Sequence, residues 1–277
     1  MSDVATKHGP LPLANKVAVV TGAARGLGRA FAHRLAALGA DVAVLDIDLD
    51  GAAKFNETLD APSVPDEIRA SGRRSIGIQV NLGHRAEVIA AMDRVRNELG
   101  GIDVLVNNAG GLFTPMEGSA ASTFSQEDFQ ALFDANFQST VHCCQQVVPG
   151  MRARGGGVIV NIASQSGVSV YPGGHMAAYA VAKAAVSHYT RYLATEVGPW
   201  GIRANCLAPG IMLTSRVAHQ AQLRGVGTDA QAQAIPLRRL GVPEDCAGVL
   251  EFLVTDLSRY VTGQCICVDG GVVLTPS

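Results

Sequence analysis

A tyrosine and a lysine stand four residues apart in Tyr179-Ala180-Val181-Ala182-Lys183, near the start of a stretch whose pattern predicts a helix over 177–197. The i, i+4 spacing places the phenol and the ammonium on one face of that helix, a turn apart. A nearby ammonium favours the phenolate and so lowers the tyrosine pKa from about 10 towards neutrality. The pair therefore predicts a tyrosine that gives a proton to a substrate oxygen or takes one from it.

A glycine-rich turn, Thr21-Gly22-Ala23-Ala24-Arg25-Gly26-Leu27-Gly28, directly follows an apolar run and opens a helical pattern. Glycines permit a tight turn, let the backbone approach a pyrophosphate, and allow the helix and strand to pack closely. The free N–H groups at the N-terminus of the new helix then face the anion. Asp46 ends the next apolar run, 18 residues after Gly28, which suits a carboxylate that binds the adenosine ribose. This order of features predicts a dinucleotide-binding site rather than a mere strand-to-helix turn.

Asp46 also indicates which dinucleotide is bound. A 2′-phosphate beside this carboxylate would be repelled, whereas the two ribose hydroxyls can donate hydrogen bonds to it. Arg25 leaves alternatives open, because its guanidinium suits a phosphate, a nearby acid or the pyrophosphate. The expected cofactor is NAD.

Seven short apolar runs alternate with helical patterns and predict the strands that position these groups. The strands are expected at 17–20, 42–45, 76–80, 102–106, 158–162, 204–207 and 265–268, and helices at 27–38, 86–99, 126–151, 177–197 and 243–255. This alternation predicts an α/β fold of the Rossmann type, a single-domain doubly wound parallel sheet with helices on both faces. Residues 1–14 are expected to form a flexible leader, and residues 15–277 a single dinucleotide-binding and catalytic domain.

Three segments stand outside this alternation. Residues 49–65 look inserted, with Pro62 and Pro65 interrupting a would-be helix, and residues 114–125 are rich in Ser, Ala and Gly and read as a loop. Residues 211–235, rich in Ala and Gln, are expected to form a mobile lid over the cleft.

Composition excludes several classes of protein. The 277 residues are 48% hydrophobic and 17% charged, which suits a sizeable core and argues against disorder. The net charge of −2 without long basic runs predicts no nucleic-acid partner. No apolar run reaches the ~18–20 residues of a membrane span, and no signal-peptide core is seen, so a soluble cytoplasmic protein without a membrane partner is expected. The six cysteines lack C-x-x-C spacing, so no metal is expected and they are interpreted as reduced core residues.

Over residues 16–271 the sequence resembles the short-chain dehydrogenase/reductase family. The matching pieces occur in order and are Thr21-Gly22-x-x-x-Gly26-x-Gly28, Asn107-Asn108-Ala109-Gly110, Asn136, Ser164, Tyr179-x-x-x-Lys183, Pro209-Gly210 and Thr262-Gly263-Gln264…Asp269-Gly270-Gly271. The resemblance implies an oxidoreductase that transfers a hydride between NAD(H) and a secondary alcohol or its ketone, without a metal. It also implies a homotetramer built through the helices at 126–151 and 177–197.

The resemblance implies a role for each catalytic residue. Tyr179 is the general acid or base at the substrate oxygen, and Lys183 lowers its pKa and hydrogen-bonds the nicotinamide ribose. Ser164 holds the substrate oxygen, and is preferred to Ser166 because the reactive serine of the family is the third residue after Asn161. Asn136 positions a water behind Lys183. The residues implied to bind the cofactor are Gly22, Arg25, Gly26, Leu27, Gly28, Asp46, Ile47, Asn81, Leu82, Asn108, Ala109, Gly110, Tyr179, Lys183, Pro209, Gly210, Ile211 and Thr214.

The sequence departs from the family or leaves a role open at a few positions. Asn81 stands where the family often has an Asp that contacts the adenine, and His175 is a candidate second acid/base or a solvated loop residue. The candidate substrate lining is apolar and favours a hydrophobic or cyclic alcohol, although the same residues suit an ordinary core; it comprises Leu112, Phe113, Val168, Met176, Met212 and Leu213.

Two rival functions share this fold. An NADP-dependent 3-oxoacyl-thioester reductase is disfavoured by Asp46, and a non-catalytic NAD(H)-binding sensor is disfavoured by the intact set of Ser164, Tyr179 and Lys183. The sequence has neither a G-x-S-x-G elbow nor a G-x-x-x-x-G-K-[ST] loop, which excludes the α/β-hydrolase and P-loop classes.

Overall fold

The computed structural model describes residues 11–224 and 226–274, with the side chains of all of them except residues 220–224. These residues are built around one seven-stranded sheet of order β3-β2-β1-β4-β5-β6-β7, in which all neighbouring strands are parallel. The strands are β1 (Val17–Thr21), β2 (Asp41–Asp46), β3 (Ser75–Gln79), β4 (Val104–Asn107), β5 (Gly157–Ile162), β6 (Ile202–Pro209) and β7 (Cys265–Val268). The predicted doubly wound parallel sheet is confirmed, and all seven strands lie where the apolar runs predict them.

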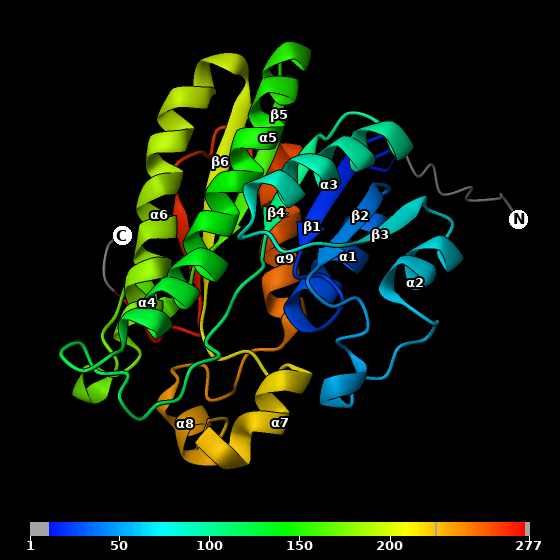
Figure 1. Cartoon of the computed structure of the whole chain (residues 1–277). Coiled ribbons are helices and arrows are strands. Elements are labelled where there is room, and N and C mark those ends of the chain that lie inside the picture. Colours follow the sequence, from blue (N-terminus) through cyan, green and yellow to red (C-terminus); the bar gives the residue numbers. More distant parts are fainter. Residues whose placement is uncertain (1–10, 225, 275–277) are drawn as a thin grey trace, which may run out of the picture.

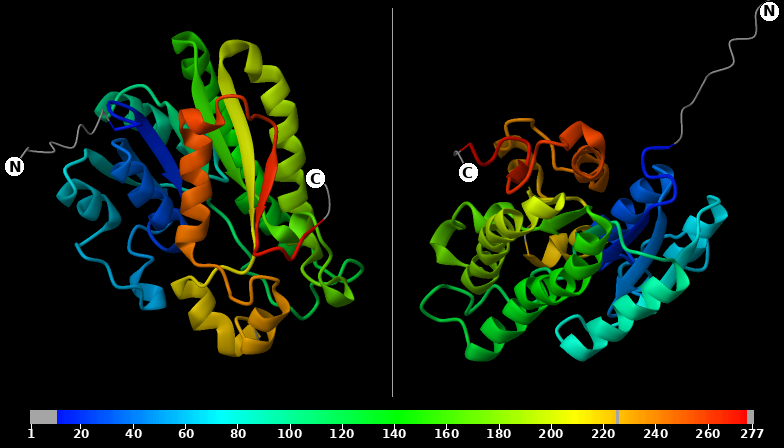
Figure 2. Two further views of the ribbon diagram at one scale, coloured as in Figure 1. Left: turned by 180° about the vertical axis from the view of Figure 1, so that it is seen from behind. Right: turned by 90° about the horizontal axis from the view of Figure 1, so that it is seen from above.

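The described helices cover both faces of the sheet (Figure 2). They are α1 (Gly26–Ala37), α2 (Val64–Ala70), α3 (Arg85–Glu98), α4 (Gln126–Phe133), α5 (Ser139–Arg154), α6 (Ala177–Val197), α7 (Ser215–Arg224), α8 (Asp229–Ala234) and α9 (Pro243–Val254). Alternate residues of the central strands enter two main cores, because successive side chains of a strand point to opposite faces, and a smaller third cluster includes residues of β6 and β7. One core packs the strands against α1, α2 and α9, and the other packs them against α3, α5 and α6. None of the described helices is both long and apolar enough to cross a membrane.

The long helix predicted over 126–151 is divided into two helices by a π-helical turn, η2 (Asp134–Gln138). The chain stays helical through this turn, so the predicted helix exists but has a wider turn inside it. Such turns re-aim the side chains that they carry. Asn136 lies at the centre of the turn and is fully buried.

The interpretation of Pro65 as a helix breaker is wrong. Pro65 lies in the first turn of α2, where the missing proline N–H has no intrahelical partner to lose. The Oγ of Ser63 accepts a hydrogen bond from the N–H of Asp66 at 3.3 Å and caps the helix. The inserted segment therefore ends at Ser63, and a short 3-10 helix, η1 (Ala53–Phe55), lies within it.

The domain begins before residue 15. Leu13 is buried in the core beside α1 and donates its N–H to the carbonyl of Leu38 at 2.8 Å. Residues 11–14 of the predicted leader thus belong to the domain, and residues 1–10 lie outside the described part of the chain.

The loop predicted over 114–125 is fastened to the start of α6. The Oγ of Ser119 accepts a hydrogen bond from the N–H of Met176, and its carbonyl accepts one from the N–H of Ala177, both at 3.1 Å. Met176 has a left-handed backbone, φ 60°, at the N-cap of this helix. The loop thereby supplies acceptors that the first N–H groups of a helix lack.

Candidate active site

The carboxyl ends of the parallel strands share one edge of the sheet, and α7 and α8, on the chain that leaves β6, lie below that edge in Figure 1. The glycine turn follows β1, Ser164 follows β5 and Pro209 ends β6, so this edge collects residues from distant parts of the sequence. The strand order reverses between β1 and β4, which is where ligands bind in open α/β sheets.

Ser164, Tyr179 and Lys183 meet at this edge. Lys183 is 3% exposed, its Nζ donates to the carbonyl of Ile162 at 2.8 Å, and the same Nζ lies 5.9 Å from the centre of the Tyr179 ring. The Ser164 hydroxyl lies close enough to the Tyr179 phenol to lower its pKa as a polar neighbour. The Oγ of Ser164 also accepts the N–H of Ser166 at 3.2 Å, which fixes the hydroxyl at the end of β5.

The pKa of Tyr179 differs from the sequence expectation. Burial raises it above its ordinary value, while the nearby Ser164 hydroxyl and the positive charge of Arg216 lower it in part. Lys183 itself has its pKa lowered to about 8, chiefly by burial, with a further lowering from Arg216. The i, i+4 argument missed the effect of burial, which disfavours the charged form of both groups.

Asn136 holds the loop that follows β4. Its Nδ2 donates to the carbonyls of Leu132 at 2.8 Å and Gly111 at 3.1 Å, and its Oδ1 accepts the N–H of Gly111 at 2.8 Å. These contacts make Asn136 a positioning residue for the loop beside the catalytic groups. Its predicted role in holding a water behind Lys183 stays a prediction.

The glycine turn and the end of β4 form one cradle. Asn108 donates its Nδ2 to the carbonyls of Thr21 and Gly22, each at 3.0 Å. A Cβ built on Gly28 would lie 2.1 Å from the Gly22 oxygen, and one on Gly22 would lie 2.9 Å from the Cα of Ala109. The close approach is possible only for glycine, and it leaves the N-terminus of α1 facing the cleft. These residues fit a dinucleotide, whose pyrophosphate the turn would hold.

Asp46 lies beside this cradle at the end of β2. Its Oδ2 accepts the N–H of Ala24 at 3.0 Å, and its Oδ1 accepts the N–H of Asp48 at 3.1 Å. Burial raises the pKa of Asp46, and these backbone donors and the charge of Arg25 oppose that rise. The guanidinium of Arg25 stacks on the ring of Phe55, 4.4 Å from its centre, which adds a contact to the alternatives open for Arg25.

The remaining predicted cofactor residues are distributed around the same edge. Thr214 faces Gly26 across the cleft, since a Cβ on that glycine would lie 3.6 Å from the Cβ of Thr214. Asn81 turns its Oδ1 to the N–H of Gly83 at 3.0 Å, and Leu82 is buried in the second core. Ile47 is 64% exposed.

Gly210 follows the end of β6, and its N–H donates to the carbonyl of Val268 at 2.9 Å. It lies beside Gln165. The Oε1 of Gln165 is buried and has no hydrogen-bond partner among the described residues.

The apolar residues expected to line the substrate divide into two groups. Met212 is 6% exposed and belongs to the core with α1 and α9, so the core alternative holds for this residue. Phe113 and Leu213 are 49% and 46% exposed, and Met176 lines a small pocket with Thr114 and Leu132. The apolar surface offered to a substrate therefore comes from the loops, and Met212 supports them from below.

Two residues that sequence reasoning missed lie at the site. Arg216, on α7, acts electrostatically on Tyr179 and Lys183, and Glu57, in the inserted segment, binds the first N–H of α1. Neither belongs to a motif, and neither has a local spacing that points to the site. The sequence contains one indication of Glu57. The inserted segment that contains it follows β2 and Asp46, which places the segment near the expected binding site of the cofactor's adenosine.

Comparison with known proteins agrees with this geometry. The family model described as enoyl-(acyl carrier protein) reductase matches residues 22–273. The chain is 44% identical over 266 residues to cyclohexanol dehydrogenase of Rhodococcus sp. (strain TK6), covering 95% of this chain and 97% of that protein. It is 34% identical over 262 residues to the 3-oxoacyl-[acyl-carrier-protein] reductase of Staphylococcus epidermidis (strain ATCC 35984), covering 94% and 100% of the two chains.

A solved structure shows the same likeness in three dimensions. It is a 7α-hydroxysteroid dehydrogenase complexed with NADH and 7-oxo-glycochenodeoxycholic acid, with a TM-score of 0.81 at 34% identity and coverage of 97% and 98%. The chain is an oxidoreductase and belongs to the short-chain dehydrogenase/reductase family.

Proposed function

We propose that this protein catalyses the NAD-dependent interconversion of a secondary alcohol and its ketone. The observation that carries the proposal is the meeting of the Ser164 and Tyr179 hydroxyls beside the buried Lys183, at the same strand edge as the glycine cradle. Such a pair can hold one substrate oxygen with two hydroxyl groups while a proton moves to or from it.

Each residue has one task in this mechanism. Ser164 and Tyr179 orient the substrate oxygen, and Tyr179 takes the alcohol proton during oxidation or returns it during reduction. When bound, the nicotinamide supplies the acceptor or donor of the hydride. Lys183, held by the Ile162 carbonyl, keeps a positive charge near the phenol and lies where the nicotinamide ribose is expected.

The preference for NAD over NADP rests on Asp46. Its two oxygens already accept backbone N–H groups at the glycine turn, so the carboxylate is held in place and would face the 2′-phosphate of a bound NADP. The negative charges of the carboxylate and a 2′-phosphate would repel each other, whereas the ribose hydroxyls can donate hydrogen bonds to the carboxylate oxygens. The solved 7α-hydroxysteroid dehydrogenase holds NADH, which supports the same choice.

A hydrophobic, cyclic substrate is the proposed class. The exposed rings and methyl groups of Phe113, Leu213 and Val170 lie on loops that follow β4, β6 and β5. The similarity to a cyclohexanol dehydrogenase supports a compact cyclic alcohol over a long acyl chain.

The second candidate is a 3-oxoacyl-thioester reductase that uses NADPH. The similarity to a 3-oxoacyl-[acyl-carrier-protein] reductase at 34% identity favours it, and Asp46 opposes its cofactor.

One experiment separates the two candidates. The purified protein is mixed with cyclohexanol or another cyclic secondary alcohol and with either NAD⁺ or NADP⁺. The absorbance of the reduced nicotinamide measures the rate at which the alcohol is oxidised. A parallel arm measures reduction of an acetoacetyl thioester with NADH or NADPH. Turnover of the cyclic alcohols with NAD⁺ supports the proposal. Turnover confined to the thioester with NADPH contradicts it.

A further inference from the structure

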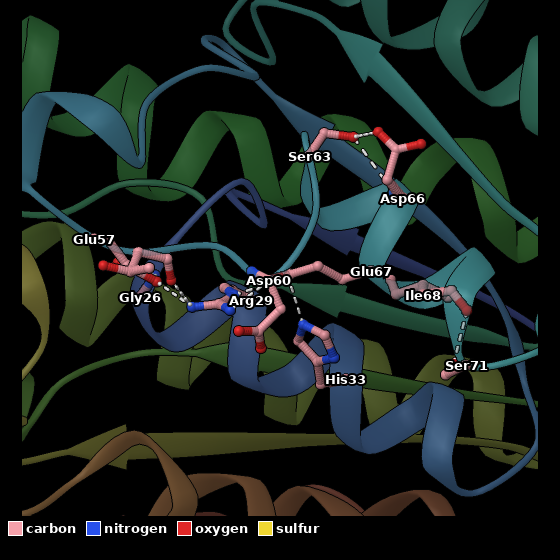
Figure 3. Close-up of polar contacts among 11 residues, drawn as sticks. Gly26, Arg29, His33, Glu57, Asp60, Ser63, Asp66, Glu67, Ile68 and Ser71 are labelled. Carbon is pink, nitrogen blue, oxygen red and sulfur yellow. Dashed lines mark hydrogen bonds and ion pairs between the residues drawn. The ribbon is translucent and has the colours of Figure 1, made fainter.

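A carboxylate of the chain itself lies on the N-terminus of α1. Both oxygens of Glu57 accept the N–H of Gly26 at 3.0 Å, and its Oε1 lies 3.3 Å from Nη1 of Arg29 (Figure 3). The Glu57 side chain is 13% exposed. Gly26 begins α1, so its N–H is one of the donors that the helix leaves free for an anion.

Arg29, which contacts Glu57, is also held by contacts that do not involve Glu57. Arg29 makes a two-point contact with Glu67 of α2, at 2.9 Å from Nε and 2.6 Å from Nη2. Glu67 also accepts the backbone N–H of Asp60 and lies 2.8 Å from His33 (Figure 3). Because Arg29 keeps these contacts without Glu57, departure of Glu57 leaves α1 and α2 joined.

Glu57 also joins the inserted segment to α7. Its Oε2 accepts a hydrogen bond from the hydroxyl of Ser215, the first residue of α7. Phe55 meets the ring of His219 edge to face, with centroids 5.9 Å apart, and Arg25 stacks on the same phenyl ring. Figures 1 and 2 show this segment beside α7, below the carboxyl ends of the strands. The segment and α7 thus close over the glycine turn from two sides.

The cofactor's pyrophosphate needs the position that Glu57 holds. In the proposed function, on which this step rests, the pyrophosphate lies at the N-terminus of α1 and takes its N–H groups. A phosphate that accepted the Gly26 N–H would lie within a few ångströms of the Glu57 carboxylate, and two anions this close repel at a partly buried site. We propose that Glu57 limits the affinity of the cofactor site by competing with the dinucleotide pyrophosphate, so that binding requires Glu57 to leave Gly26 and the inserted segment to part from α7.

This competition has a defined signature. It lowers the affinity of the protein for every ligand that carries the pyrophosphate and leaves the affinity for a ligand without a pyrophosphate unchanged. It also makes association slow, because a closed contact must open before the phosphates reach α1. Glu57 is therefore a determinant of cofactor affinity and of the rate of cofactor exchange. Its role is separate from that of Asp46, which is proposed to bind the ribose hydroxyls and to select NAD over NADP.

The test compares three variants of the full-length protein with wild type. Glu57→Gln keeps the shape and removes the charge, and Glu57→Ala removes both. Asp60→Asn makes the same change of charge three residues away, at an exposed side chain. Isothermal titration measures the dissociation constants of NADH and NADPH, of ADP-ribose, which carries the pyrophosphate, and of adenosine, which does not. Stopped-flow fluorescence measures the association rate of NADH, and melting temperatures verify that each variant is folded.

The expected result is tighter binding of NADH and ADP-ribose by about tenfold in Glu57→Ala, which corresponds to ~1.4 kcal/mol, with a smaller gain in Glu57→Gln. NADH association becomes faster in both variants. The affinity for adenosine and all constants of Asp60→Asn stay at the wild-type values. Unchanged or weaker NADH binding in the Glu57 variants, with a wild type that binds, overturns the role of Glu57 alone. If neither wild type nor variants bind NADH or NADPH, the dinucleotide function fails and this proposal fails with it.

Discussion

The guanidinium of Arg216 lies against Gly111, so closely that a Cβ on this glycine would come within 2.6 Å of Nη2. Gly111 is the residue that Asn136 holds from behind through its N–H and its carbonyl. The positive charge of Arg216 reaches Tyr179 and Lys183 and changes the pKa of both. A residue of α7 is therefore part of the electrostatics of the reacting centre, although it is far from the catalytic motif in sequence.

Replacing Arg216 by Gln is expected to move the pH profile of alcohol oxidation to higher pH. Loss of the cation leaves the phenolate of Tyr179 less stabilised, so the tyrosine pKa rises. The measurement is kcat against pH with saturating NAD⁺. Arg216→Lys keeps the charge and is the control. A profile that stays in place, or that moves to lower pH, would show that Arg216 does not act on Tyr179.

Tyr179→Phe removes only the hydroxyl and is expected to leave the fold and NADH binding close to wild type. Turnover should fall by ~10²–10⁴-fold, because general acid–base catalysis contributes about that much. The measurements are kcat and the NADH dissociation constant. Ser166→Ala is the matched control, since it removes a hydroxyl two residues from Ser164 without touching the proposed pair. Retention of more than about a tenth of wild-type turnover, with chemistry rate-limiting, would contradict the assignment and make His175 the next candidate.

The buried Lys183 predicts a pH dependence of stability. Burial lowers its pKa from 10.5 to about 8 in the folded protein. Between these values the unfolded chain binds more protons than the folded one, so the contribution of Lys183 to the free energy of unfolding rises as pH increases through this window. Below pH 8 both states carry the proton and the burial of the charge is a constant penalty.

Urea denaturation of wild type and Lys183→Met at several values between pH 7.5 and 10.5 measures this effect. The wild type should gain up to ~3 kcal/mol relative to the variant across the window, because one pKa unit corresponds to 1.36 kcal/mol. Equal slopes for the two proteins would mean that Lys183 is not shifted. The same variant should also bind NADH more weakly, because the ammonium near the expected ribose is lost.

Asp46→Ser is expected to narrow the preference for NAD(H) over NADP(H). The change removes both the repulsion of a 2′-phosphate and the ribose contact, so kcat/KM with NAD⁺ falls while that with NADP⁺ rises. Asp50→Asn is the control, because it removes the same negative charge from an exposed side chain four residues further along the chain. A wild type that prefers NADP⁺ would show that Arg25 or another basic group outweighs Asp46.

We expect the protein to be a homotetramer in solution. The small residues Ala184 and Ala185 on α6 permit close packing of helices, and Tyr192 on the same helix is 71% exposed. Light scattering at micromolar concentration measures the assembly, and Tyr192→Asp should shift it towards smaller species. A wild type that stays monomeric would contradict the expectation.

The strands could be predicted because each is a short apolar run buried on both faces, and such runs are visible without tertiary information. The role of Pro65 could not, because a proline that interrupts a helix and one that begins it look alike until the cap at Ser63 is identified. The π-helical turn around Asn136 was equally invisible, since the side chains there keep the spacing of one long helix.

The site was predicted as far as its motifs reach. The glycine turn, Ser164, Tyr179 and Lys183 lie at one edge because parallel strands bring their carboxyl ends together. The direction of the Tyr179 pKa was missed because burial, which decides it, depends on every element packed around the ring. Glu57 and Arg216 were missed because each acts on residues more than thirty positions away, where local spacing carries no information.

The attachment of the 114–125 loop to α6 has a consequence for the evolution of specificity. Ser119 supplies acceptors to the N–H groups of Met176 and Ala177, the residues that begin the helix of Tyr179. New substrates are accommodated most simply by altering such a loop, since loops tolerate change. Here any lineage that reshapes the loop around Ser119 also disturbs the anchorage of its own acid–base residue. Adaptation is therefore expected to be easier through Phe113 and Leu213, which are exposed and free of that linkage.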